Sequence, residues 1–442
     1  MNDISLIKRK EIIDALRRGT VPKRGLEVFA VGLEGFEEAI DSELESAAAG
    51  NGVFKAVRGE YGTGKTFFSR WLEHRARQKG FATALVQVSE TDTPLHRMET
   101  VYRRALESLQ TQEWTQAAFR RLIDKWFFEL EEEALGALGE EVDDAEQIAG
   151  AVGDLLEKRL AAVSATQPQF AAALRAAHTA RLRNEHGVSE GLLAWIMGQP
   201  NVGAGVKRAA NLKGDLDHRG ASGFFRGLLA VLRQLGRAGL VLVIDEVETI
   251  QRVRADSREK SLNAIRQLID ELDGGSYPGM YVLMTGTPQF YDGPQGVRRL
   301  AALEQRLRVR FDPKTTEYDN PRAIQIRLTP FDRERLIEVG KRIRDIFPAE
   351  DEEDLRSRVG DDVLRMLADG IGGQLGGKVG VPPRVYLREL VEVLDKVDIH
   401  ATYDPKEHCV PVISAADLTP EERAAAGMER DVDDIELDLG GE

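Results

Sequence analysis

The sequence predicts an α/β fold with a parallel-sheet core, a large all-helical insert and a small C-terminal helical lid. Three observations predict this fold. Residues 53–57 form a short β-rich run that leads into a glycine-rich loop and then into a helical pattern at 67–77. Residues 239–246 read GLVLVIDE, and such an unbroken apolar run suits a strand buried on both faces of a parallel sheet. Between these two strands, residues 96–222 read almost wholly helical.

The glycine-rich loop spans residues 59–66 and matches the pattern G-x-x-x-x-G-K-[ST]. Its glycines let the backbone curl so that N–H groups point at phosphate oxygens, and the following helix presents its N-terminus to the anion. Lys65 is expected to reach the β- and γ-phosphates, and the Thr66 hydroxyl to ligate Mg²⁺. The alternative is a glycine turn that binds nothing. The residues expected to bind ATP are Gly59, Glu60, Tyr61, Gly62, Thr63, Gly64, Lys65, Thr66 and Phe67.

Two acids end the apolar run, and they form the predicted second half of the site. Asp245 and Glu246 lie at the C-terminal end of the expected strand, where open α/β sheets bind their ligands. Asp245 would hold Mg²⁺ through water, and Glu246 would polarise the attacking water as the base of a hydrolysis. The alternative is a strand that ends in two solvated acids.

A third core strand is expected at residues 280–287, which read MYVLMTGT and turn polar at Thr285. A hydroxyl at this position is expected to touch both the γ-phosphate and the hydrolytic water, with Thr287 as the second choice. The alternative is a threonine that only caps the end of the strand.

Two segments carry candidate arginines that would respond to the γ-phosphate. Residues 301–311 read AALEQRLRVRF, a strand or helix end with its arginines on one face. An arginine finger here would complete the site of a neighbouring subunit, with Arg306 first and Arg310 second, whereas the alternative is a solvated arginine face. Arg384 stands at the expected start of the last lid helix, where it would reach over the nucleotide phosphates. The alternative is that Arg384 pairs with a carboxylate.

The remaining pattern is consistent with this plan. A helix is expected at 5–18, a second strand at 81–89 and a further strand at 323–328. Pro22, Leu26 and Val31 could line an adenine pocket or simply pack in the core. The predicted parts are an N-terminal segment with the first half of the core (1–95), the helical insert (96–222), the second half of the core (223–329), the lid (330–398) and a tail (399–442).

Two segments leave alternatives open. Residues 201–223 are rich in glycine and basic side chains, so they form either a flexible connector or a contact for a partner or nucleic acid. The end of the tail is acidic and lacks aromatic residues, which favours disorder. Its Ile435, Leu437 and Leu439 alternate with acids, and this pattern could instead dock as an added strand.

Composition sets the outer limits. The 442 residues are 42% hydrophobic and 30% charged, as expected for a chain with a sizeable core. The single cysteine excludes an intramolecular disulfide framework and fits a reducing cytoplasm. No long apolar run or leader is evident, so we expect a cytoplasmic protein without a membrane association. The net charge of −14 argues against general affinity for nucleic acid, although a local basic surface could still bind DNA.

The ordered motifs resemble an AAA+ ATPase of the origin-recognition and initiator type. The resemblance rests on the glycine loop, Asp245-Glu246, Thr285, the arginine segment and the sequence Gly-x-Pro-Pro-Arg that ends at Arg384, and it covers residues 1–90 and 220–398. It implies a P-loop NTPase (AAA+) fold. A narrower set is similar to the ATP-binding component, the D protein, of BREX bacteriophage-defence systems. That set is IIDALRRGTVP at 12–22, AVG at 30–32, RGEYGTGKTFF at 58–68 and TPF at 329–331.

The resemblance implies a cytoplasmic, Mg²⁺-dependent ATPase that acts as a nucleotide-driven switch in phage defence. It also implies a homo-oligomer or an assembly with other defence-system proteins. Origin-recognition proteins continue into a C-terminal winged helix that reads DNA, but little chain follows Val397 here, so DNA binding is not carried over. Two other readings stay open: a nucleotide-gated scaffold with little turnover, and a DNA-acting initiator or loader.

Overall fold

The computed structural model describes residues 4–138, 145–374 and 382–409. The chain divides into two compact units. The sheet unit contains Glu38–Val57 and Leu72–Ile326, and the lid unit contains Met1–Glu37, Arg58–Trp71 and Arg327–Glu442. The docking motif expected around Ile435 and the glycine of the Gly-x-Pro-Pro-Arg sequence lie outside the described residues. The expected domain boundaries stay a prediction.

The core of the sheet unit is a five-stranded sheet with the order β2-β3-β4-β1-β5. β2, β3 and β4 run parallel, with Gln87 opposite Asp245 and Ile244 opposite Met284. All of β3 is buried, as its unbroken apolar sequence predicts. These observations confirm an α/β fold with a parallel sheet. The strands are β1 (Val53–Arg58), β2 (Ala82–Gln87), β3 (Leu240–Asp245), β4 (Met280–Gly286) and β5 (Gln325–Arg327).

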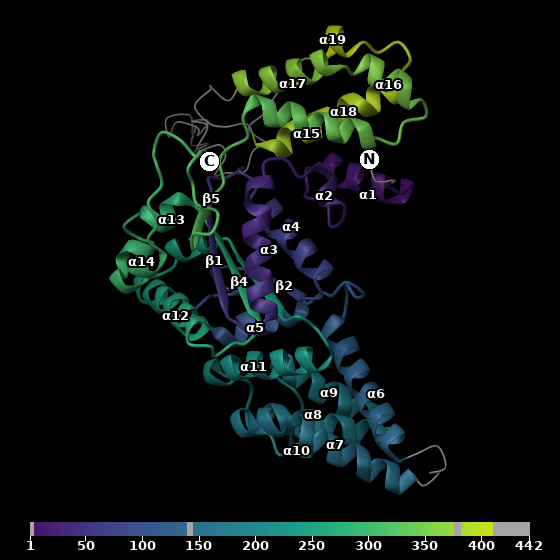
Figure 1. The fold of residues 1–442 in the computed structure, drawn as a ribbon, viewed down its shortest axis with the longest axis vertical. Helices are drawn as coiled ribbons and strands as arrows, with labels where there is room; N and C mark the ends of the chain where they lie inside the picture. The colour runs from purple at the N-terminus through teal and green to yellow at the C-terminus, as the bar shows by residue number, and fades with distance from the viewer. Residues whose placement is uncertain (1–3, 139–144, 375–381, 410–442) are drawn as a thin grey trace, which may run out of the picture. The chain divides into compact units, whose positions relative to one another are not determined.

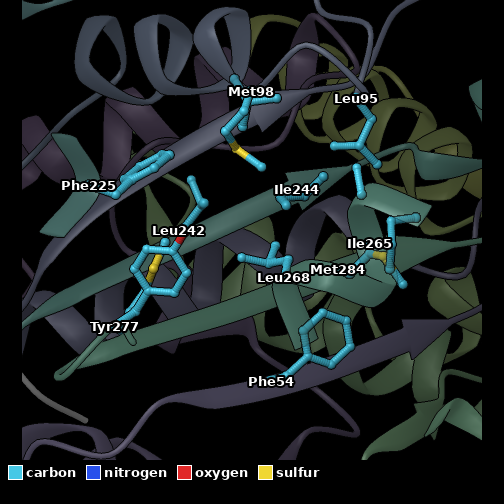
Figure 2. Close-up of a pocket in the computed structure, with 13 residues that line it drawn as sticks. Phe54, Leu95, Met98, Phe225, Leu242, Ile244, Ile265, Leu268, Tyr277 and Met284 are labelled. Carbon is cyan, nitrogen blue, oxygen red and sulfur yellow. The ribbon is translucent and has the colours of Figure 1, made fainter. Parts of the chain in front are cut away.

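Three helices cover one face of this sheet: α5 (Met98–Glu107), α11 (His218–Gln234) and α12 (Ala255–Asp273). Figure 2 shows Met98, Phe225 and Ile265 from these helices meeting Leu242 and Met284 from the strands around a small cavity with an apolar lining. Each such side chain that is fully buried contributes about 1.5–3 kcal/mol to folding. The face is therefore a hydrophobic core that fixes where the strand ends lie within this unit.

Within the expected insert of 96–222, the described residues between 118 and 209 form a bundle whose regular elements are helices. Its helices share one continuous core with α11, because Phe170 and Trp195 pack against Phe224 with ring centroids 5.2 and 5.5 Å apart. Figure 1 shows this bundle beside α11. Its helices are α6 (Ala118–Leu138), α7 (Ala145–Thr166), α8 (Pro168–Leu182), α9 (His186–Ile196) and α10 (Ala204–Ala209).

The segment at 201–223 is more regular than a connector. It contains α10, and α11 begins inside it at His218, where the Asp217 side chain caps the helix by accepting a hydrogen bond from the N–H of Gly220 at 2.8 Å. The other short elements of the sheet unit are 3₁₀ turns at Val247–Gln251 and Val297–Arg299, α13 (Pro288–Asp292) and α14 (Ala301–Leu307).

The lid unit has its own core. Apolar side chains of α1 (Leu6–Arg17) and α2 (Leu26–Phe29) pack against the lid helices, and Arg17 pairs with Asp395 of α18 at 2.8 Å. Gly19 ends α1 with a φ of 66°, which glycine adopts without strain. The lid helices are α15 (Arg333–Ile346), α16 (Glu352–Arg358), α17 (Asp361–Gln374), α18 (Pro383–Ile399) and α19 (Pro405–His408).

Two further helices have residues in both units: α3 (Glu34–Ala48) and α4 (Lys65–Gln78). Across the described ranges, none of the helices combines the length and the apolar character that crossing a membrane requires.

Candidate functional site

The glycine-rich loop connects β1 to α4, as predicted. Gly62 and Gly64 have φ values of 78° and 92°, a backbone conformation that side chains disfavour. At Gly59, a β-carbon would lie 2.3 Å from Oγ1 of Thr63, which itself donates a hydrogen bond to the Glu60 carbonyl at 2.8 Å. The three glycines are thus required by the curl of the loop and by the packing inside it.

Lys65 folds over this loop. Its ammonium donates to the carbonyls of Gly59 at 2.8 Å and Glu60 at 3.2 Å, and it lies 4.9 Å from the ring centroid of Tyr61. The side chain is only 9% exposed. A buried ammonium held by the loop's own carbonyls is already aimed at the concave side of the turn. The residues present therefore fit a polyphosphate, which would add anionic oxygens within reach of the same ammonium.

The start of α4 supplies the other expected ligands. The helix begins at Lys65, so Thr66 and Phe67 lie in its first turn, the end of a helix that favours an anion. Phe67 packs edge-on against Phe29, with ring centroids 5.4 Å apart. Leu26 and Val31 are buried in the apolar core of the lid unit, and Pro22 is also buried. Their membership of an adenine pocket stays a prediction.

The acidic pair is organised around Thr285. Asp245 at the end of β3 is 5% exposed and accepts a short hydrogen bond from the Thr285 hydroxyl. The Glu246 N–H is directed at both side chains, 3.1 Å from Oδ1 of Asp245 and 3.3 Å from Oγ1 of Thr285. The structure thus brings three predicted site residues together. One carboxylate oxygen of Asp245 is committed to Thr285 and the backbone, and carboxylate oxygens are the ligands that Mg²⁺ prefers.

Glu246 leaves the strand in a left-handed conformation, with a φ of 60° and a ψ of 43°. Such a conformation is uncommon for a residue other than glycine, and it turns the side chain away from the course of β3. The carboxylate is held by Gln87 of β2, whose amide nitrogen lies 2.9 Å from Oε2. Sequence reasoning missed Gln87. The signal was its place at the end of β2, directly opposite Asp245 in the parallel register.

Thr287, the second choice for the residue that touches phosphate, is the N-cap of α13. Thr287 is 4% exposed, and its hydroxyl caps α13 by accepting from the Phe290 N–H at 3.4 Å. Thr285 is therefore the threonine of β4 that contacts the acidic pair. A role for either residue toward phosphate or water stays a prediction.

The arginines of α14 and its continuation differ in their pairing. Arg306 pairs with Asp270 of α12 at 2.7 Å, and Arg308 pairs with Glu304 at 3.3 Å. Arg310 is exposed, and its side chain has no ion pair or hydrogen bond among the described residues. Arg384 is exposed in the first turn of α18, where its aliphatic stem passes Gly19. Of the two candidates for an arginine finger, Arg310 is therefore the one whose side chain is available to contact another molecule.

The predicted site residues fall into two groups. The glycine loop belongs to the lid unit, and the acidic pair with Thr285 belongs to the sheet unit. Their meeting around one nucleotide stays a prediction. In the described part of the chain, His, Cys, Asp and Glu nowhere gather in threes as a metal site would need. Mg²⁺ held by one or two protein oxygens is typical of sites that share the ion with substrate phosphates, so the donors fit that use.

A glycine loop between a strand and a helix, together with a parallel sheet that carries acids at a strand end, is consistent with a P-loop NTPase. The comparison with protein families identifies the group. Residues 4–412 match the family described as the BREX system ATP-binding protein BrxC/D, and the chain belongs to that family. No curated protein matches the chain. The protein is therefore an ATP-binding protein of a phage-defence family.

Proposed function

We propose that the protein is a Mg²⁺-dependent AAA+ ATPase that uses its nucleotide state to switch assembly with other components of a cytoplasmic phage-defence system. The observation that carries this proposal is the network at the end of β3. Asp245, Thr285 and the Glu246 N–H are joined by hydrogen bonds. An ordered acidic pair of this kind suits metal binding and activation of water.

In the proposed site, the glycine loop and the acidic pair close around one ATP. The loop N–H groups and Lys65 bind the phosphates, and Thr66 and Asp245 would hold Mg²⁺. The ion supplies charge neutralisation at the β- and γ-phosphates when it is bound. Glu246 accepts a proton from the attacking water. The Thr285 hydroxyl holds the Asp245 carboxylate and the Glu246 backbone N–H in fixed positions relative to one another. The support is the fit of each donor set within its own unit and membership of an ATP-binding family.

The proposal includes a second copy of the chain. Arg310 of a neighbouring subunit would enter the site and stabilise the charge that develops on the transferred phosphoryl group, while Arg384 of the lid responds to the γ-phosphate. An arginine supplied in this way accelerates phosphoryl transfer by roughly 10³–10⁵-fold. The supporting observation is that Arg310 is exposed and unpaired among the described residues, whereas Arg306 and Arg308 are paired.

The test is ATP hydrolysis measured against protein concentration. We expect the rate per subunit to rise with concentration, because a shared site forms only in an assembly. Lys65→Ala should abolish ATP binding, whereas Glu246→Gln should bind ATP and lose turnover by about 100-fold or more. Lys10→Ala and Glu259→Gln are matched controls, since both side chains are exposed. Wild-type turnover in Glu246→Gln would refute the assignment of the base.

A nucleotide-gated scaffold with little turnover is the second candidate. The observation that favours it is the bond from Gln87, because an amide that holds the Glu246 carboxylate keeps the base away from water. Addition of duplex DNA or defence-system partners separates the two readings. An ATPase has a rate that such a ligand raises, whereas a scaffold stays slow in every mixture while ATP changes its assembly.

A further inference from the structure

The segment between α14 and β5 is tied down at both ends. We call Arg308 to Asn320 the arginine loop. At its start, the Gln325 side chain donates a hydrogen bond to the Leu307 carbonyl at 2.9 Å. After its end, the Lys55 ammonium donates to the carbonyls of Pro321 at 3.0 Å and Ala323 at 2.6 Å. Both anchoring side chains come from strands, so the loop is fastened to the sheet and not only to its neighbours in sequence.

Lys55 is an unusual anchor because it is 1% exposed in the middle of β1. Its third partner is Glu43 of α3, with Nζ and Oε1 2.5 Å apart, and the Tyr281 hydroxyl of β4 donates to the other oxygen of Glu43 at 2.7 Å. Burial lowers the pKa of Lys55 and raises the pKa of Glu43. A buried ion pair adds little stability compared with apolar residues. The pair instead fixes the backbone after the loop, because the Lys55 ammonium holds the Pro321 and Ala323 carbonyls in place.

The loop itself is built from turns. Asp312 accepts from the Lys314 N–H at 2.8 Å, Thr315 from the Glu317 N–H at 3.1 Å and Asn320 from the Arg322 N–H at 2.9 Å. Such side-chain bonds to nearby N–H groups order a turn without regular secondary structure. Tyr318, within this series of turns, is 80% exposed. The loop thus presents polar and aromatic groups from a fixed base.

Arg310 is the cation that this arrangement presents. Arg306 before it is fixed to α12 through Asp270, and Leu307 is buried. Beyond these anchors, Arg308 turns back to Glu304, and Arg310 is exposed with no partner in the part of the chain that the structure describes. Ordering an arginine side chain and its loop costs free energy on binding, and a loop that is ordered beforehand avoids part of that cost.

We propose that Lys55 and Gln325 are positioning residues that hold the arginine loop so that Arg310 enters the nucleotide site of a second copy of this chain. The inference rests on the proposed function, because it assigns a supporting role toward the same shared site. Lys55 also lies on β1, the strand that leads into the glycine loop. Lys55 and Gln325 are therefore required in the subunit that supplies Arg310, and not in the subunit whose nucleotide site Arg310 enters.

The experiment separates the two subunits by mixing variants. Lys65→Ala cannot bind ATP and serves only as an arginine donor, whereas Arg310→Ala keeps its own site and serves only as an acceptor. An equal mixture should hydrolyse ATP faster than the sum of the two proteins alone. Gln325→Leu added to the donor should lower that gain by about tenfold or more, since small displacements of a catalytic group are costly. The same change added to the acceptor should leave the gain within about twofold.

Controls keep the result interpretable. Gln305→Leu in the donor removes an exposed glutamine of α14 that has no partner among the described residues, and it should leave the gain unchanged. Lys55→Met in the donor should act like Gln325→Leu. Because that change leaves Glu43 buried without its cation, the variant could fold poorly, and the Gln325 variant decides in that case. Hydrogen exchange over residues 308–320 should be faster in either variant.

Two outcomes overturn the inference by itself. Equal losses on the donor and acceptor sides would show a purely structural role, and no loss on the donor side would show that the anchors do not position Arg310. If the parent mixture gains no activity, the shared site of the proposed function fails and takes the inference with it. The failure of the proposed function is therefore distinguishable from the failure of the anchors.

Discussion

The side-chain amide of Gln87 donates a hydrogen bond to the carboxylate of Glu246, with Nε2 and Oε2 2.9 Å apart. Gln87 ends β2 and Glu246 directly follows β3, the parallel neighbour of β2, and Glu246 reaches this contact through a left-handed backbone conformation. A carboxylate that accepts this bond has one lone pair fewer to offer to a water molecule. The contact is therefore a restraint on the proposed base, and breaking it tests whether the restraint limits turnover.

We predict that Gln87→Ala raises the basal rate of ATP hydrolysis several-fold without changing ATP affinity. The bond to a charged acceptor is worth roughly 1.5–3 kcal/mol, and its loss lets Glu246 meet water more often. The measurement is steady-state turnover at saturating ATP. Gln267→Ala is the matched control, because Gln267 also donates to a carboxylate, Glu271, at 2.7 Å on the surface of α12. A rate below that of the wild type would mean that Gln87 orients Glu246 for catalysis.

Gly59→Ala should abolish ATP binding. The new β-carbon would lie 2.3 Å from Oγ1 of Thr63, so the loop must open or Thr63 must give up its bond to the Glu60 carbonyl. Calorimetric titration with ATP measures the loss. The double variant Gly59→Ala/Thr63→Ala removes the clashing oxygen and should regain part of the affinity. Equal affinities for the single and double variants would show that this contact does not set the loop geometry.

The parts of the fold that the sequence predicted are those with local signals. The apolar run of β3 predicts a buried strand, and the spacing from Gly59 to Thr66 predicts the curled loop. Both features depend on residues that are adjacent in the sequence. The helical character of the insert is local in the same sense. Asp217 shows the limit, since its cap starts α11 inside the glycine-rich segment 201–223, which the sequence left open as a flexible connector.

The groups that sequence reasoning missed depend on distant partners. Lys55 is the one charged residue in the otherwise apolar run at 53–57, and nothing in that run indicates that Glu43, Pro321 and Ala323 would surround its ammonium. Gln87 acquires its meaning only through the register of β2 with β3. Choosing between Arg306 and Arg310 likewise required the position of Asp270, which pairs with Arg306. No spacing in the sequence encodes these contacts.

Thr285→Val should retain ATP binding and lose most turnover. The substitution keeps the shape of the buried side chain but leaves Asp245 and the Glu246 N–H without a shared hydroxyl, which costs about 1–3 kcal/mol for a buried group. Measuring turnover and ATP affinity together distinguishes a loss of catalysis from a loss of binding. Thr287→Ala loses only a helix cap, worth about 1 kcal/mol, and should turn over ATP at the wild-type rate when folded.

The helical insert should lose stability as the pH falls below about 6.5, the ordinary value for histidine. His178 of α8 is 3% exposed, and burial first, then nearby Arg181, lowers its pKa, while the Glu131 carboxylate opposes this shift. Because the folded state then binds fewer protons than the unfolded state, stability is present above the unfolded pKa and falls as the unfolded chain becomes protonated.

The measurement is hydrogen exchange over α6 and α8 at pH 7.5 and 5.5 in the full chain. His178→Gln removes the titrating ring and should reduce the loss of protection at the lower pH, whereas His186→Gln, at the exposed start of α9, should keep the full loss. Partial burial and nearby Arg97 also lower the pKa of His96, so the comparison is confined to α6 and α8 and made between these two variants. If the wild type and His178→Gln lose equal protection, the Glu131 pair cancels the cost of burying the ring, and the expected pH dependence of the insert is wrong.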